Sequence, residues 1–64
     1  MQHESIPITV YLTDEQAQAF AQFLKRVGLD DYRGLAVDQQ EAYVMRSAGE
    51  AVRAGLALAG YAPR

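Results

Sequence analysis

The chain is 64 residues long and contains no cysteine, which excludes disulfides and thiolate metal sites. Its single histidine, His3, lies in a polar N-terminal stretch, and the net charge of −2 gives no general attraction to nucleic acid or anionic lipid. A domain this small has a marginal core and commonly needs a partner subunit when disulfides and metals are absent. We therefore expect a homodimer. No signal peptide or membrane-spanning apolar run is recognisable, so we also expect a cytoplasmic protein.

The N-terminal part of the chain predicts a strand. Residues 1–5 are polar and are expected to form a flexible tail, which leaves residues 6–64 as a single domain. Residues 6–12 alternate with a period of two, which places one set of apolar side chains on a single face: Ile6, Ile8, Val10 and Leu12. This alternation is typical of a strand with one buried face, and Pro7 suits its beginning or an edge.

A helix is predicted directly after this strand. Thr13-Asp14-Glu15-Gln16 matches a capping box, and the apolar period then changes to 3.6. The inward side is expected to hold Ala17, Phe20, Ala21, Leu24 and Val27, with Phe23 on its flank. Gly28 is expected to end the helix in a left-handed conformation.

The remaining residues predict a connector and a second helix. Residues 29–37 are expected to contain one short helical turn over Tyr32–Ala36, capped by Asp30 or Asp31. The second helix is expected to start at a cap formed by Asp38 and to end at about Ala59, before Gly60. Its apolar and small residues cover roughly 200° of the helical wheel, against about 100° for a helix with one neighbour. This helix should therefore have two packing partners.

The predicted fold class is α+β and mostly helical, with one N-terminal strand followed by two amphipathic helices. Because only one strand is predicted, its simplest partner is the same strand of a second copy, antiparallel about a two-fold axis. Pairing with the irregular stretch 33–37 is the alternative. The expected dimer interface consists of Ile8, Val10, Leu12, Ala48, Val52, Gly55 and Leu56.

The sequence contains no convincing catalytic or cofactor-binding pattern, so we expect neither an enzyme nor a cofactor. Ser5, Ser47 and His3 offer little for nucleophilic catalysis, because a tail residue rarely holds catalytic geometry. The acidic stretch from Asp30 to Glu41 partly imitates a calcium loop, but it lacks two ligands and the required glycine. Two successive helix caps explain the same acids.

The order strand–helix–helix in a dimer resembles ribbon-helix-helix proteins, a family of dimeric DNA-binding regulators that includes many antitoxins. The resemblance implies that outward residues of the paired strands, here Thr9 and Tyr11, would read bases. The strand and tail carry no lysine or arginine and the domain is acidic, which argues against DNA binding. This function is therefore the alternative.

Several segments are similar to a family of short, uncharacterised bacterial proteins that are often encoded on mobile elements. The similar segments are Leu12–Ala17, Phe23–Gly28, Asp31–Arg33, Glu41–Met45 and Gly60–Arg64. The resemblance implies a bacterial setting and no activity. It also allows a role as an inhibitor or accessory protein of the anti-CRISPR kind.

The function expected from these patterns is that of a small homodimeric protein-interaction module. Tyrosine and arginine are enriched among interface anchors. The candidates for contacting another protein are Tyr32, Arg33, Tyr43, Arg46 and Arg53. Tyrosines at the edge of the core and a solvated ladder of arginine and glutamate would give the same sequence pattern.

Overall fold

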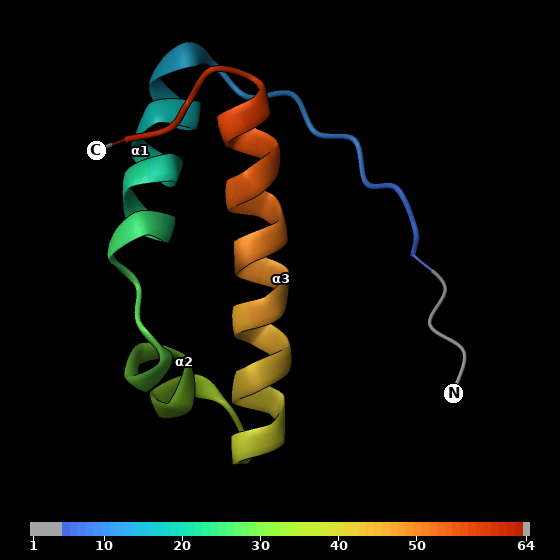
Figure 1. Ribbon diagram of the computed structural model, residues 1–64, viewed down its shortest axis with the longest axis vertical. Coiled ribbons are helices and arrows are strands. Elements are labelled where there is room, and N and C mark those ends of the chain that lie inside the picture. Colours follow the sequence, from blue (N-terminus) through green and yellow to red (C-terminus); the bar gives the residue numbers. More distant parts are fainter. Residues whose placement is uncertain (1–4, 64) are drawn as a thin grey trace.

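The computed structural model describes residues 5–63, which form three α-helices (Figure 1). Helix α1 spans Asp14–Arg26, α2 spans Leu29–Leu35 and α3 spans Gln39–Leu58. Helices α1 and α3 lie side by side and run in opposite directions, while α2 packs on α3 and closes one end (Figure 1). We call the pair α1 and α3 the helical hairpin. In the described part of the chain, no helix combines the length and hydropathy that a membrane crossing requires.

The caps of α1 confirm its predicted start. The amide of Gln16 donates to Thr13 Oγ1 at 3.1 Å, and the amide of Thr13 donates to Gln16 Oε1 at 2.9 Å. The helix ends at Arg26, with Val27 as its C-cap. Gly28 is not the left-handed stop that was expected: its φ is −112°, and it serves as the N-cap of α2.

The connector is more ordered than its sequence predicts. Seven residues form α2, which starts three residues earlier than the expected turn and includes both aspartates. The carboxylate of Asp31 accepts from the amide of Gly28 at 2.7 Å, so it caps the helix from inside its first turn. The turn was placed too late because glycine at an N-cap gives a weak sequence signal.

The caps of α3 also follow the prediction. Asp38 Oδ1 accepts from the amide of Glu41 at 2.8 Å, and Glu41 Oε1 accepts from the amide of Val37 at 2.7 Å. These bonds show that the two acids of the calcium-like stretch act in capping. At the other end, Gly60 has a φ of +103°, which lets the chain reverse and return toward α1.

The line of contact between the helices is built from small side chains. Four apolar residues are buried in the described part of the chain: Ala17, Ala21, Leu24 and Ala42. Met45, Gly49 and Leu56 continue the line along α3 and are half-buried. No large side chain is completely buried among the described residues. The hairpin therefore has a narrow core for a chain of this length.

The expected N-terminal strand and the strand-paired dimer are wrong. Residues 5–13 are extended but contain no strand, and no backbone hydrogen bond involves residues 5–12. This segment leaves the helices on the side of α3 opposite α1 (Figure 1). Its apolar side chains are exposed, because the described chain offers no second extended segment to pair with. The fold is thus all-helical over residues 5–63, rather than α+β.

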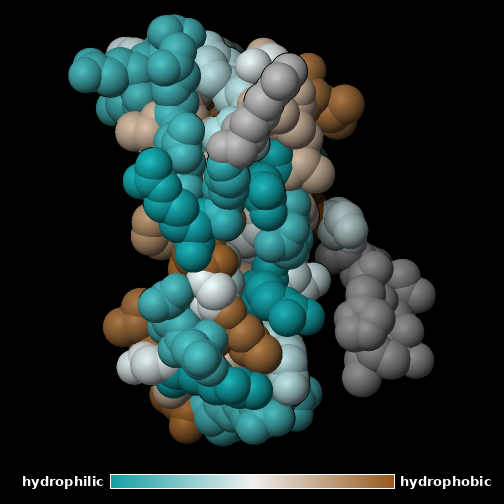
Figure 2. Space-filling view, turned by 60° about the vertical axis from the view of Figure 1, so that its left-hand side comes forward, coloured by the Kyte–Doolittle hydropathy of each residue, from teal (hydrophilic) through white to brown (hydrophobic). Residues whose placement is uncertain are grey.

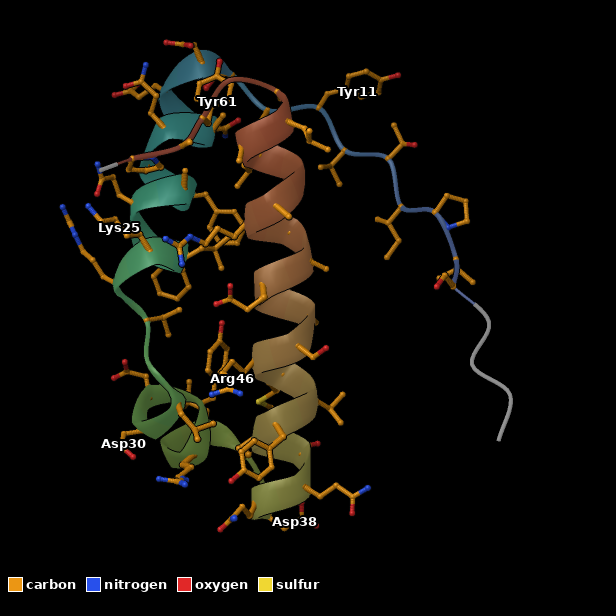
Figure 3. The ribbon with its side chains drawn as sticks, viewed as in Figure 1. Tyr11, Lys25, Asp30, Asp38, Arg46 and Tyr61 are labelled. Carbon is orange, nitrogen blue, oxygen red and sulfur yellow. The ribbon has the colours of Figure 1, made fainter. Side chains whose placement is uncertain are left out.

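Two further expectations depend on that strand. Thr9 and Tyr11 are exposed in the unpaired segment, and Figure 3 shows Tyr11 pointing away from the helices. They do not lie on a two-stranded ribbon, so the ribbon-helix-helix likeness fails at the fold. The expected tail of residues 1–5, His3 included, lies outside the described residues apart from Ser5.

Candidate functional site

One side of the helical hairpin is apolar and exposed. Five of the seven residues of the contact line are preceded by an apolar or small residue: Phe20 before Ala21, Phe23 before Leu24, Val44 before Met45, Ala48 before Gly49, and Gly55 before Leu56. The other two, Ala17 and Ala42, follow Gln16 and Glu41 in the first turns of their helices. In every α-helix, the preceding residue points about 100° away around the helix axis, always in the same sense relative to the direction of the chain. Because α1 and α3 are antiparallel, the same turn brings these residues to the same side of the hairpin.

We call this surface the hairpin face and define it by six residues: Phe20, Phe23, Val44, Ala48, Val52 and Gly55. Its four large side chains are exposed by 41% (Phe20), 55% (Phe23), 62% (Val44) and 47% (Val52). The rings of Phe20 and Phe23 stack with centroids 5.8 Å apart and planes within 6°. Beside them, Gln16 and Ala19 complete an apolar hollow on the surface of α1. The face is therefore apolar and only shallowly contoured.

Charged side chains are kept off this face. Six of the seven residues that follow the contact line are polar, the exception being Ala57: Gln18, Gln22, Lys25, Tyr43, Arg46 and Glu50. Beyond the first turn of α3, every charged residue of the hairpin falls at a position turned away from the hairpin face. Figure 2, in which the α1 side comes forward, accordingly shows a mostly hydrophilic surface with separate hydrophobic patches. The hairpin is thus amphipathic as a unit.

The expected dimer-interface residues are divided among three places. Ala48, Val52 and Gly55 lie on the hairpin face, whereas Leu56 turns into the contact line and is half-buried. Ile8 and Val10 are exposed in the N-terminal extended segment, and so is Leu12. The structure therefore groups three of the four helical residues of the expected set and separates them from the three N-terminal residues.

Phe20 and Phe23 were missed as surface residues. The sequence pattern assigned Phe20 to the core and Phe23 to its flank, because phenylalanine on the apolar arc of a helix is usually buried. The available signal was the pair Ala17 and Ala21, whose small side chains let α3 approach and leave the aromatic rings outside.

Of the five expected partner-binding residues, Tyr32 has a clear packing role. Its ring lies against α3 at Gly49, where an added Cβ would be 3.2 Å from Tyr32 Cζ. The residue is half-buried and links α2 to the hairpin.

Three of the other candidates gather where α2 meets α3. The guanidinium of Arg46 lies 5.8 Å from the centre of the Tyr43 ring, and Figure 3 shows Arg46 beside α2. Arg33 pairs with Asp30 at 2.8 Å, and hydrogen bonds to Asp30 and then to Tyr43 raise its pKa. Arg53 lies further along α3, with its nearest partner Glu50 at 3.9 Å. This cluster is on the polar side of the hairpin.

The C-terminal segment closes the other end. The hydroxyl of Tyr61 donates to Asp14 Oδ1 at 2.6 Å, and Figure 3 shows Tyr61 at the first turn of α1. This hydrogen bond, followed by burial, raises the pKa of Tyr61 above its ordinary value. A depression beneath the segment is lined by Asp14, Gln18, Gln22 and Tyr61. The contact ties the two chain ends of the hairpin together.

Comparison with known proteins places the chain in a family. It belongs to a family of unknown function (DUF7706), whose model matches residues 1–64. No curated protein and no solved structure matches the chain. The family covers the whole hairpin and carries no assigned activity, so a function has to be argued from the geometry.

Proposed function

We propose that the protein is a small protein-interaction module that docks through the hairpin face. The observation that carries this proposal is the exposure of Phe20, Phe23, Val44 and Val52 on one side of the hairpin. Contiguous apolar surface of this kind is typical of binding sites, whereas scattered apolar residues are not. The proposed role is binding rather than catalysis, because the feature that supports it is an apolar surface.

Docking would bury apolar side chains that the core of the single chain leaves exposed. Removing a large apolar side chain from water stabilises a protein by about 1.5–3 kcal/mol. The four large side chains of the hairpin face are only partly covered, while three of the four buried residues are alanines. Covering the face would therefore add to the apolar burial that the narrow core provides.

The cluster of Arg33, Tyr43 and Arg46 would stay accessible in such a complex. It lies on the polar side of the hairpin, so docking through the hairpin face leaves it exposed. These residues remain the proposed contacts for a further protein. The bacterial, mobile-element setting and a role of the anti-CRISPR kind rest on the sequence resemblance alone, and docking does not depend on them.

A pair of single-cysteine variants tests the docking proposal. The chain has no cysteine, so Ala48→Cys and Ser47→Cys each introduce one thiol. Ala48 is on the hairpin face, and Ser47 is its neighbour, turned about 100° away on the same helix. Both positions are exposed in the isolated chain, which makes Ser47→Cys a matched control.

Labelling by a charged maleimide is measured for both variants, purified at micromolar concentration and at nanomolar concentration in lysate of the source cells. We expect the thiol of the Ala48→Cys variant to react at least about tenfold more slowly than that of Ser47→Cys in one or both settings. Equal labelling of the two variants in both settings would contradict docking through this face.

A further inference from the structure

We infer that the occupant of the hairpin face is a second copy of this chain, so that two hairpins form a four-helix bundle. This inference rests on the proposed docking function and names its partner. It replaces the strand-paired dimer with a dimer made by helices. The homodimer is supported by the exposed area, by the arrangement of large and small residues, by the register of the hairpin and by the distribution of charge.

The exposed area exceeds what a folded monomer of this size should show. A chain of 7.1 kDa is expected to expose about 4,100 Å² when folded. This chain exposes 5462 Å². The excess is about 1,400 Å², part of which belongs to the N-terminal segment, and a stable dimer buries about 800 Å² per partner. The excess shows that the single chain leaves more surface in water than a compact fold of its size does, and the exposed side chains of the hairpin face contribute to it.

The hairpin face is complementary to itself. Its bulky aromatic residues are on α1, whereas the part of the face on α3 includes the small residues Ala48 and Gly55. A two-fold axis parallel to the helices places α1 of each copy against α3 of the other. The stacked rings of Phe20 and Phe23 would then lie over the α3 part of the hairpin face of the second copy. Neighbouring helices are antiparallel throughout, as in up-down four-helix bundles.

The register of the hairpin places Phe20 and Phe23 of α1 level with Val52 of α3 along the helix axes. Leu24 lies 3.7 Å from the position of a Cβ at Gly49, so residue 24 of α1 is level with residue 49 of α3. With antiparallel helices, Phe20 and Phe23 are then level with Val52 and its neighbours. An axis parallel to the helices preserves this height in the second copy. The aromatic pair would therefore meet Val52 of the second copy, with Ala48 and Gly55 about one turn to either side of it.

Charge does not oppose this association. Burying an unpaired charge in an interface costs several kcal/mol, and the hairpin face carries none. Lys25, Arg46, Glu50 and Arg53 lie on the other side, where they would remain in water in the bundle. The polar side would become the outer surface of the dimer.

Sedimentation equilibrium of the full chain tests the inference, with Phe23→Asp as the variant and Gln22→Asp as its matched control. Both substitutions add one negative charge at adjacent positions of α1, but only Phe23 is on the hairpin face. We expect twice the 7.1 kDa chain mass for wild type and for Gln22→Asp. Phe23→Asp should weaken the dimer by about thirtyfold or more, as loss of a central aromatic contact does.

If Phe23→Asp fails to fold, Ala48→Glu provides the second variant, because glutamate is a good helix former and position 48 is exposed in the single chain. It should also be monomeric. A wild-type chain that is monomeric at all concentrations would overturn the inference, as would a dimer that survives both substitutions. In either case, a protected thiol in the Ala48→Cys variant would leave docking to another protein intact. If the thiol of Ala48→Cys reacted as fast as that of Ser47→Cys in both settings, both the homodimer and docking to another protein would be contradicted.

Discussion

The ring of Tyr32 fills the space in which a side chain at Gly49 would begin. A Cβ at position 49 would meet the Tyr32 hydroxyl, and it would lie 3.2 Å from Tyr32 Cζ and 3.7 Å from Leu24 Cδ2. Tyr32 belongs to α2, Leu24 to α1 and Gly49 to α3, so all three helices meet at this point. The contact explains why α3 contains a glycine in its interior, where this residue lowers helix stability.

Gly49→Ala should destabilise the protein by about 1–2 kcal/mol, because the cost of overpacking exceeds the gain in helix propensity. Gly34→Ala in α2 is the matched control, since nothing lies within 4 Å of a Cβ there. It should stabilise by about 0.5–1 kcal/mol. Urea unfolding of both variants measures the difference, and equal shifts of the same sign would contradict the packing role of Tyr32.

Asp38→Ala should lower the free energy of unfolding by about 1 kcal/mol, because it removes the side-chain acceptor at the start of α3. Asp38→Asn keeps a side-chain acceptor and should cost much less. Thermal unfolding followed by circular dichroism compares the two. If Asp38→Asn and Asp38→Ala lowered the free energy of unfolding equally, the side-chain cap would not be the way in which Asp38 stabilises the protein.

The contact between Tyr61 and Asp14 should make stability depend on pH in the alkaline range. The hydrogen bond raises the pKa of Tyr61 in the folded chain, so folding favours the protonated phenol. Its contribution is present below the ordinary tyrosine pKa of about 10 and is lost as the pH rises through the higher folded value. Stability should therefore decrease above pH 10 in wild type. Tyr61→Phe should lack this component, and an identical pH profile in the two proteins would refute it.

Val10→Asp should change the free energy of unfolding by less than about 0.5 kcal/mol, as is usual for an exposed position without special contacts. A buried paired strand, as the alternating sequence predicts, would instead make this substitution strongly destabilising. Val10 is 66% exposed and lies in a segment without backbone hydrogen bonds. Chemical denaturation of this variant distinguishes the two expectations, and a large loss would show that the segment is buried against something.

The helices could be predicted from the sequence because their signals are local. The capping box at Thr13 and the cap at Asp38 each involve residues three positions apart, and the left-handed glycine comes directly after the C-cap of α3. The alternation over residues 6–12 predicted a strand with one buried face, and this prediction was wrong. A strand needs a second segment to pair with, which no local pattern reveals.

The candidate site was only half predictable for a similar reason. The wide apolar arc of α3 predicted a second packing partner for this helix, and Ala48, Val52 and Gly55 of that arc are exposed in the single chain. Phe20 and Phe23 were assigned inward because amphipathic patterns give the centre of an apolar arc and not the side on which the neighbouring helix lies. That side depends on the small residues Ala17 and Ala21, which decide how closely α3 can approach.

In the proposed dimer, a second copy of the chain supplies the surface that covers Phe20, Phe23, Val44 and Val52. The most direct measurement is the melting temperature of the wild-type chain over a hundredfold range of protein concentration. A dimer gains about 2.7 kcal/mol from a hundredfold increase, which corresponds to a rise of about 10 °C for two chains of this size. A melting temperature that does not change with concentration would contradict the claim.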